Sequence, residues 1–299
     1  MIGCRNTNVP SSEDCLYLSL YVPEKVDSTR KLAVLVWVYG GGFWSGSATL
    51  DVYDGKIFSS EEDVIIVAMN YRVQHGSLDQ LLALKWVHTN IEVFGGDPNR
   101  ITLFGESAAS HHSKRSAVAP WALENRQVAL HRSVVLYDSM KCANTSSARM
   151  DNLAPEQWNM EEVWHCLMNA SAEKIRNLSD SEWAPVTGFA DFPWVPVIDG
   201  DFLLENAATS LKQGNFKKTQ LLAGSNLDES IYFVVYQLAD VFPPAEFFDK
   251  NKHFINSREV WLKSISNLLP RQMLKSSLAL QAILHEYEPM ELPVPPKAI

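Results

Sequence analysis

The chain has 299 residues, of which 46% are hydrophobic and 20% are charged, a composition typical of a globular protein with a sizeable core. Its net charge of −9 argues against nucleic-acid binding, which needs a basic face, and no apolar run of about 18 residues predicts a membrane span. The acidic balance would suit steering of a cationic substrate, although plain solubility is the commoner explanation. No repeat or linker divides the sequence, so we expect one domain over residues 1–299.

The first third of the chain contains three apolar runs that predict strands, at residues 16–22, 32–38 and 64–69. The second run is followed, after Tyr39, by the triplet Gly-Gly-Gly at residues 40–42. Glycines placed directly after a core strand leave backbone N–H groups unshielded, which is how an oxyanion hole for acyl transfer is built. A flexible loop is the alternative, and the triplet alone would favour that loop.

A helix is predicted at residues 81–94, because apolar side chains recur there at helical spacing. Ser77 is expected to cap this helix, and Gln80 to complete a capping box. The apolar positions are Leu84, Val87, Ile91 and Phe94.

The helix should be followed by a stop, a turn and a short strand. Gly95 and Gly96 end the helical pattern, residues 97–99 (Asp-Pro-Asn) predict a turn, and residues 101–104 are an apolar strand. This order brings the chain to its most informative segment.

Gly-Glu-Ser-Ala-Ala at residues 105–109 places Ser107 directly after the predicted strand. A nucleophile elbow holds its serine on a sharp strand-to-helix turn and needs small neighbours, because strand and helix cross closely there. Ala109 stands at the last glycine of the G-x-S-x-G pattern and adds a Cβ at the tightest point. Glycine and serine also mark ordinary turns. The strand before Ser107 and the glycine triplet favour the elbow, with Gly41, Gly42 and the N–H of Ala108 as the oxyanion hole.

The rest of the chain is predicted to be mainly helical. Helices are expected at residues 122–141, 161–168 and 258–286, the last with a break near Pro270, and one further strand at residues 220–223. The proline-rich tail at residues 288–299 predicts an extended or disordered end.

Six long segments resemble type-B carboxylesterases, and within that family the invertebrate acetylcholinesterases. The likeness covers most of residues 10–287 in order. It implies an α/β-hydrolase fold, a mostly parallel sheet flanked by helices, that hydrolyses a carboxylic ester, choline esters by preference, through an acyl-serine without a metal or organic cofactor. The segments are SEDCLYLSLYVP, VWVYGGGFWSGSATLDVYDG, VAMNYRV, GGDPNRITLFGESA, FPWVPVIDGDFL and FKKTQLLAGSNLDES.

The resemblance implies a catalytic triad of which two members can be named. Ser107 is the nucleophile and Glu229 matches the acid, although a carboxylate at a helix start is another interpretation of Glu229. The base should follow Glu229 in the chain, where only His253 and His285 occur, and neither resembles the loop histidine followed by glycine that the family uses. His111 and His112 would lie along the elbow helix instead of across the site. We therefore expect the catalytic histidine to be absent.

The substrate-binding residues are implied in part. Phe192 would line the acyl pocket with Trp121 nearby, and Glu106 would place a negative charge beside the nucleophile. Aromatic residues after Glu229 would line the gorge and offer π-faces to a cation, or would form a core helix face, and both interpretations stay open. These are Tyr232, Phe233 and Tyr236.

Cysteines and sequons favour a secretory origin. The resemblance implies a disulfide between Cys142 and Cys166, and a partner for Cys15 that would precede this sequence. Cys15 is then expected to keep a free thiol unless Cys4 substitutes, while four cysteines alone allow three pairings. The family is secreted or cell-surface, yet the sequence shows no signal peptide at its start. The sequons begin at Asn144, Asn169 and Asn177.

The departures from the family predict an incomplete fold. The sequence starts late and lacks the tryptophan that receives a quaternary ammonium. It also lacks segments between Val73 and Leu78 and after Ala109, and it ends at Ile299. A gapped sheet with an unpaired edge would follow. We expect an ester hydrolase impaired by loss of its histidine. The alternatives are a catalytically inactive cholinesterase-like protein used in binding or adhesion, and an incomplete gene product. The oligomeric state is not predicted.

Overall fold

The computed structural model describes residues 12–24, 30–73, 76–108, 160–183, 196, 198, 203–227, 229, 257–269 and 276–287. It divides into two compact units. The first unit comprises Met1–Ala184 and Phe192–Lys218, and the second comprises Pro185–Asp191 and Thr219–Ile299.

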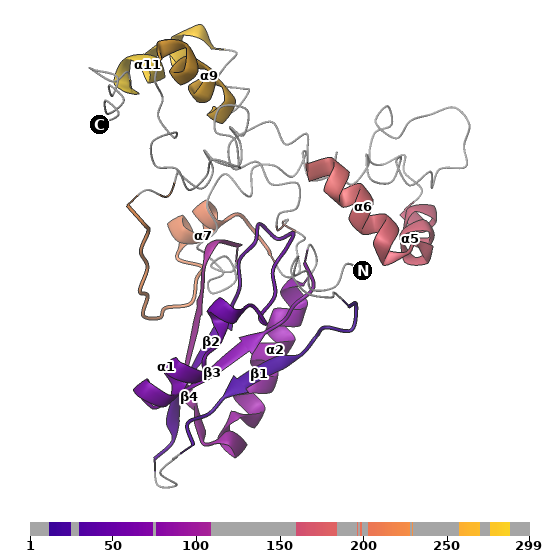
Figure 1. Cartoon of the computed structure of the whole chain (residues 1–299), viewed down its shortest axis with the longest axis vertical. Coiled ribbons are helices and arrows are strands. Elements are labelled where there is room, and N and C mark those ends of the chain that lie inside the picture. The colour runs from indigo at the N-terminus through magenta and orange to yellow at the C-terminus, as the bar shows by residue number, and fades with distance from the viewer. Residues whose placement is uncertain are drawn as a thin grey trace, which may run out of the picture. The chain divides into compact units, whose positions relative to one another are not determined.

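A four-stranded sheet in the order β1-β3-β2-β4 forms the centre of the first unit (Figure 1). β2 is parallel to both β3 and β4, whereas β1 is antiparallel to β3. Parallel neighbours require crossover connections, and helices provide them here. The strands are β1 (Leu18–Tyr21), β2 (Leu32–Val38), β3 (Val64–Met69) and β4 (Gly96–Gly105).

Short helices connect and flank these strands. η1 (Asp51–Tyr53) and α1 (Lys56–Glu62) lie between β2 and β3, and α2 (Ser77–Asn90) with η2 (Ile91–Phe94) leads from β3 to β4. The other described helices of the first unit are α5 (Met160–Asn169), α6 (Ala172–Trp183) and α7 (Ala207–Gln213). Those of the second unit are α9 (Arg258–Leu268) and α11 (Ser277–Tyr287).

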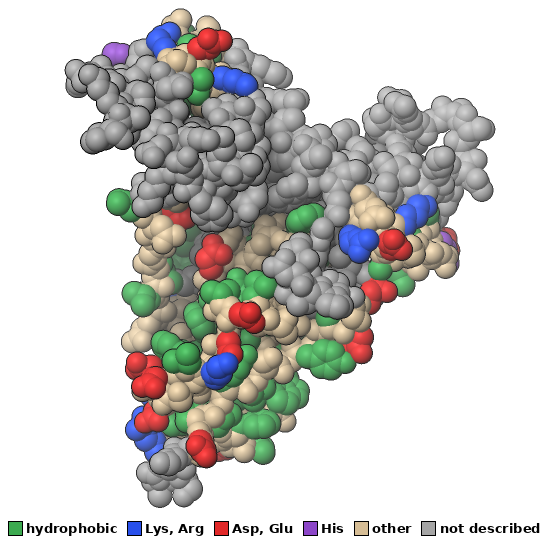
Figure 2. Space-filling view, viewed as in Figure 1, with side chains coloured by type: hydrophobic (Ala, Val, Ile, Leu, Met, Phe, Trp, Pro, Cys, Tyr) green, Lys and Arg blue, Asp and Glu red, His purple; other side chains and the backbone are tan. Residues whose placement is uncertain are grey.

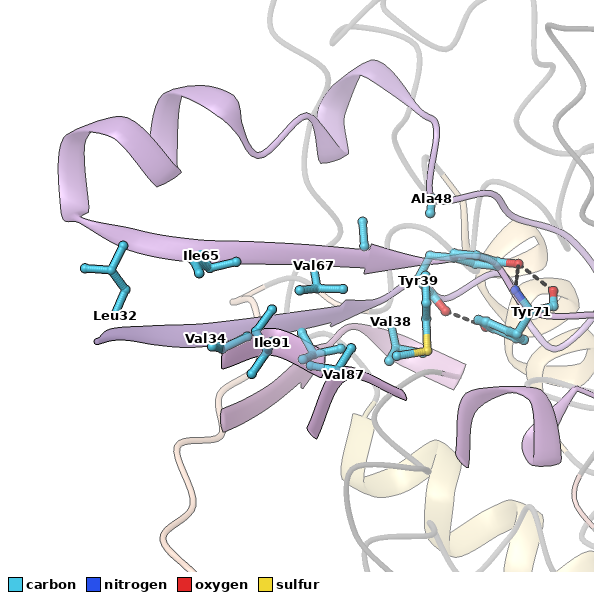
Figure 3. Close-up of a cluster of buried hydrophobic side chains, with 13 residues drawn as sticks. Leu32, Val34, Val38, Tyr39, Ala48, Ile65, Val67, Tyr71, Val87 and Ile91 are labelled. Carbon is cyan, nitrogen blue, oxygen red and sulfur yellow. Dashed lines mark hydrogen bonds between the residues drawn. The ribbon is translucent and has the colours of Figure 1, made fainter. Parts of the chain in front are cut away.

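The core of the first unit lies between the central strands and α2 (Figure 3). Val34 of β2, Val67 of β3 and Val87 of α2 are fully buried in one cluster. β2 alternates between buried and half-buried positions, while five of the six residues of β3 are buried. Burial of both faces explains why these two strands are continuous apolar runs.

The structure confirms most of the predicted elements. β2 and β3 have the predicted bounds, β1 is shorter than predicted, and the predicted helix at residues 81–94 is divided between α2 and η2. Residues 161–168 fall within α5, and residues 258–286 form α9 and α11 on either side of Pro270. The predicted helix at residues 122–141 and the tail at 288–299 lie outside the described residues.

The predicted turn at residues 97–99 is wrong, because β4 begins at Gly96 and includes them. The register passes from Leu32 with Gly96 to Val34 with Ile101, so the extra residues of β4 form a bulge. The Asp97 carboxylate accepts a hydrogen bond from the backbone N–H of Asn99 at 2.9 Å. This is the local bond that Asp makes in turns, and here it lies inside the bulge.

The predicted capping box is also wrong. The N-cap of α2 is Gly76, with no side-chain hydrogen bond, so Ser77 is already the first helical residue. Gln80 is 2% exposed, and its amide atoms have no hydrogen-bond partner, so its side chain does not reach back to the cap. Gly95 does end η2 as predicted, with a left-handed φ of 82°.

Residues 220–223 are not a strand, contrary to prediction. They have no regular secondary structure and are exposed, with Leu221 62% and Leu222 fully exposed. A strand must pair its backbone N–H and C=O groups with a neighbour, and the structure describes no such neighbour for this segment.

The described surface of the first unit carries many apolar side chains (Figure 2). Leu82 of α2 is 69% exposed and Val93 of η2 is 85% exposed. Among the described strands, β4 pairs only with β2. No described helix is long and apolar enough to cross a membrane.

Candidate active site

Ser107 lies just beyond β4 on a strained turn. Its φ of 54° is in the left-handed region, which residues other than glycine rarely adopt. The Ser107 residue is exposed, whereas Ala108 is 4% exposed. An exposed serine at positive φ directly after a strand of the sheet is the backbone arrangement of a nucleophile elbow. Ser107 and Ala108 already lie in a 3-10 turn, and the residues that follow are outside the described part of the chain.

The glycine triplet forms a hydrogen-bonded turn after β2. Trp44 and Ser45 each donate a backbone N–H to the carbonyl oxygen of Gly41 at 3.0 Å. Gly41 has a φ of 122°, and a Cβ on it would lie 2.2 Å from the carbonyl oxygen of Ser45. Only glycine fits there. The segment from Gly40 to Gly46, called the glycine loop below, is therefore a defined turn.

The two motifs meet at Gly40. A Cβ placed on Gly40 would lie 2.7 Å from the carbonyl oxygen of Glu106 and 3.0 Å from the Cβ of Ser107. β2 and β4 are parallel, with Val38 paired to Gly105, so both chains leave the sheet at the same edge. The backbone of the glycine loop is thus beside the serine, which is where oxyanion donors have to be.

A model of the carboxylesterase family matches residues 2–292, almost the whole chain. The chain belongs to the carboxylesterase family. Its sheet and helices are accordingly part of an α/β-hydrolase fold, as predicted.

Named relatives within the carboxylesterase family agree with the resemblance seen in the sequence. The chain is 56% identical to acetylcholinesterase 1 of Caenorhabditis elegans, over 98% of the chain and 51% of that protein. It is 35% identical to acetylcholinesterase of Danio rerio, over 94% of the chain and 46% of that protein. It is 36% identical to cholinesterase 1 of Branchiostoma lanceolatum, over 88% of the chain and 78% of that protein. The chain spans about half the length of the two acetylcholinesterases.

Glu106 gives this carboxylesterase site a negative charge. Its Oε2 would lie 2.9 Å from a Cβ on Gly40, so the carboxylate is close to the glycine loop. Burial, and after it the charge of Glu106, raises the pKa of Tyr53. Tyr53 packs on Trp37, which packs on Phe104, both with ring centroids 4.9 Å apart.

The predicted acid of the triad belongs to the second unit, whereas Ser107 belongs to the first. Glu229 is exposed, and its Oε1 accepts a hydrogen bond from the backbone N–H of Asn226 at 2.6 Å, which closes a local turn. Its partnership with Ser107 stays a prediction. His285 is exposed in the last turn of α11, as expected of a solvated histidine.

The disulfide and glycosylation predictions are tested only in part. Cys15 and Cys166 are each disulfide-bonded, so Cys15 has no free thiol. The alternative bond from Cys4 to Cys15 and the bond from Cys142 to Cys166 both stay predictions. Asn169 and Asn177 are exposed. In the described part of the chain, no cluster of three His, Cys, Asp or Glu side chains could hold a metal. The remaining predicted residues, which lie outside the described ranges, are His111, His112, Trp121, Cys142, Asn144, Phe192, Tyr232, Phe233, Tyr236 and His253.

Sequence reasoning assigned no role to Asn70 and Tyr71, although both are in the segment VAMNYRV that carried the family likeness. The structure ties them by hydrogen bonds to the two ends of the glycine loop. Their position directly after β3, the parallel neighbour of β2, was the only signal available. Which groups their side chains contact could not be read from spacing.

Proposed function

We propose that this chain is a serine carboxylic ester hydrolase of the cholinesterase type, with Ser107 as the nucleophile. The observation that carries the proposal is the approach of Gly40 to Ser107, at a serine with a φ of 54°. An elbow beside a glycine loop is suited to acyl transfer, because the charge that develops on the carbonyl oxygen needs preorganised N–H donors.

In this mechanism the Ser107 oxygen attacks the ester carbonyl, and the backbone N–H groups of Gly41, Gly42 and Ala108 stabilise the oxyanion. Collapse of the tetrahedral intermediate releases the alcohol and leaves an acyl-serine, which water then hydrolyses. Glu229 would orient a base, as the acid of the triad does in this fold.

No base is identified among the 299 residues, so we propose that these residues alone turn an ester over slowly. Neither His253 nor His285 has the sequence context of the family's catalytic histidine. In serine hydrolases, loss of the histidine costs about as much as loss of the whole triad, roughly 10⁶ in kcat. Oxyanion donors and binding alone leave roughly 10³–10⁴ over water.

The proposed substrate is a choline ester. Glu106 lies at the site, and the chain's net charge of −9 would attract a cationic ester. Phe192 and Trp121 would line the acyl pocket, and Tyr232, Phe233 and Tyr236 the approach to Ser107. Glycans at Asn144, Asn169 and Asn177 and a Cys142–Cys166 disulfide would accompany secretion or cell-surface display.

A second candidate function is binding or adhesion without catalysis, which applies if neither His253 nor His285 serves as the base. An incomplete gene product would have the same sequence features. An elbow that reacts with a covalent probe distinguishes a residual enzyme from these alternatives, since reaction requires an accessible serine beside oxyanion donors.

An organophosphonate ester tests the proposal, followed by peptide mapping of the labelled site. We expect slow labelling of Ser107, abolished in Ser107→Ala, and choline-ester hydrolysis at or barely above the Ser107→Ala control. Labelling that persists in Ser107→Ala would show that no elbow forms. Fast, Ser107-dependent hydrolysis would show that a base is present, and replacing His111, His112, His253 and His285 in turn would identify it.

A further inference from the structure

The glycine loop is held by two residues that follow β3. β2 and β3 run parallel and are paired as far as Trp37 with Ala68, so the chain beyond each strand emerges at the same edge of the sheet. Beyond β2 the chain enters Tyr39 and the glycine loop, and beyond β3 it enters Asn70 and Tyr71. Asn70 and Tyr71 are thus neighbours of the loop in space, although far from it in sequence.

Tyr39 and Tyr71 form a reciprocal pair (Figure 3). Their rings stack with centroids 4.3 Å apart and planes 15° apart. The Tyr39 hydroxyl donates to the carbonyl oxygen of Tyr71 at 2.8 Å, and the Tyr71 hydroxyl donates to the carbonyl oxygen of Tyr39 at 2.5 Å. Burial raises the pKa of both hydroxyls, so both remain protonated donors at neutral pH.

The two hydrogen bonds have different consequences for the loop. The carbonyl of Tyr39 and the N–H of Gly40 belong to one planar peptide group, so the bond from Tyr71 fixes the direction in which the loop starts. The bond from Tyr39 instead fixes the carbonyl of Tyr71, outside the loop. A Cβ on Gly46 would lie 2.4 Å from the Tyr39 ring, so the end of the loop packs on the same ring.

Asn70 holds the chain just after the loop. Its Oδ1 accepts hydrogen bonds from the backbone N–H of Ala48 at 2.8 Å and from the hydroxyl of Ser47 at 3.4 Å. The backbone N–H of Asn70 donates to the carbonyl oxygen of Tyr17, beside β1, at 3.0 Å. Asn70 is therefore anchored to the sheet, and its side chain ties the end of the loop to that anchor.

We propose that Asn70 and Tyr71 are positioning residues for the oxyanion loop, an inference that rests on the proposed function of Ser107. They act through the backbone on either side of the loop: Tyr71 holds the Tyr39–Gly40 peptide at its start, and Asn70 holds Ser47 and Ala48 just after its end. Donors must stay aimed at the position of the oxyanion, and a misplacement of about 1 Å can cost roughly 10² in rate. A loop with a glycine triplet has little stiffness of its own, so it needs such external supports.

The structure supplies a matched test in Tyr71→Phe and Tyr39→Phe. Both variants keep the stacked rings and lose a buried hydroxyl, but only Tyr71→Phe releases the carbonyl at the start of the loop. Hydrogen exchange, read by mass spectrometry, should show the peptide covering residues 40–46 exchanging roughly tenfold faster in Tyr71→Phe than in Tyr39→Phe. Phosphonate labelling of Ser107 should slow roughly tenfold in Tyr71→Phe and change little in Tyr39→Phe.

Asn70 offers a conservative rescue. Asn70→Asp keeps an acceptor oxygen for Ala48 and Ser47, whereas Asn70→Ala removes it. We expect residues 40–46 to exchange at the wild-type rate in Asn70→Asp and faster in Asn70→Ala. Urea midpoints measured in parallel show whether the variants differ in global stability.

Equal exchange of the loop in Tyr71→Phe and Tyr39→Phe, or in Asn70→Ala and Asn70→Asp, would overturn the positioning proposal whether or not Ser107 reacts. If the exchange contrast holds but the wild-type chain is labelled no more than the Ser107→Ala control, the proposed esterase function fails. The support of the loop by Asn70 and Tyr71 then still stands. The exchange measurement thus separates the two failures.

Discussion

The central strands of the first unit and residues 220–223 of the second were all predicted to be strands, and the structure places their apolar side chains in opposite environments. Val34 and Val36 of β2 are fully buried between paired strands, whereas Leu221 and Leu222 are 62% and 100% exposed. Both segments were predicted from runs of apolar residues, yet only β2 is a strand. The difference teaches that an apolar run reports a tendency to be buried, and that a strand also needs a neighbour whose backbone groups it can pair with.

The largest expected effect tests this comparison with one truncation in each region. Ile65→Ala removes a fully buried side chain of β3 and should lower the free energy of unfolding by about 3–4 kcal/mol. Leu222→Ala removes an exposed side chain and should change it by less than about 0.5 kcal/mol. Urea unfolding followed by circular dichroism measures both. A cost for Leu222→Ala near that of Ile65→Ala would mean that residues 220–223 are packed like a core strand.

A pair of glycine substitutions applies the same contrast to the site. A Cβ on Gly40 would collide with Glu106 and Ser107, whereas a Cβ on Gly224 has nothing within 4 Å. Gly40→Ala should therefore slow phosphonate labelling of Ser107 by roughly 10², because the loop has to move away from the serine. In Gly224→Ala, Ser107 should be labelled at the wild-type rate. An unchanged rate of Ser107 labelling in Gly40→Ala would show that the position of the glycine loop does not affect the reaction of Ser107.

The next contrast concerns two carboxylates. The Asp79 side chain is 9% exposed and accepts hydrogen bonds from the Arg72 backbone N–H at 3.1 Å, Nε at 2.7 Å and guanidinium NH₂ at 2.5 Å. Burial alone would raise the pKa of Asp79, but the bonds from Arg72 outweigh it, so the pKa is lowered. Glu229, in the other region, accepts one hydrogen bond at an exposed position. Asp79→Asn should cost about 1–2 kcal/mol at neutral pH, and Glu229→Gln should leave stability unchanged.

The sign of the pH dependence follows from that lowered pKa. A carboxyl whose pKa is lower in the folded state stabilises the fold above its unfolded value of about 3.9, and this contribution is lost as pH falls through the folded pKa. Stability should thus decline on acidification below about pH 5 in the wild type, and less steeply in Asp79→Asn. Urea midpoints from pH 7 to pH 2 provide the comparison. Parallel pH profiles of the two proteins would exclude Asp79 as a source of the acid sensitivity.

Local sequence features predicted the parts of the fold that depend on local physics. The bounds of β2 and β3 followed from continuous apolar runs, and Gly95 as a helix stop followed from its tolerance of positive φ. Asp97 and Asn99 were taken for a turn because Asp-Pro-Asn has turn chemistry, and the structure uses that chemistry for a bulge inside β4. Whether such a sequence reverses the chain or forms a bulge in a strand depends on how β4 pairs with β2. That register cannot be predicted from a local sequence pattern.

The site was predictable as a list of residues but not as an arrangement. Ser107 and the glycine triplet were each identified from motif and context, and their contact through Gly40 depends on the parallel pairing of β2 with β4. The supports of the loop by Asn70 and Tyr71 depend on β3 being the other neighbour of β2. Such relations are set by strand order, and the linear sequence of motifs leaves strand order open.

The smallest expected effect compares the start of α2 with that of α9. Ser77 was predicted to cap α2 but is its first helical residue, and no side chain caps that helix. Ser257 does cap α9, because its Oγ accepts a hydrogen bond from the backbone N–H of Val260 at 3.2 Å. Ser257→Ala should cost about 0.5–1 kcal/mol, whereas Ser77→Ala should be neutral within about 0.3 kcal/mol, since alanine is the best helix former.

Ser257→Ala and Ile65→Ala also test whether the two units unfold together. If the units unfold separately, Ser257→Ala shifts only the transition of the second unit, while Ile65→Ala shifts only that of the first. A single domain over residues 1–299 instead predicts one transition that both variants lower, each by its own amount. Tryptophan fluorescence can distinguish the outcomes, because Trp261 of α9 and Trp37 of β2 belong to different units. A Ser77→Ala cost as large as that of Ser257→Ala would restore the capping role that the start of α2 contradicts.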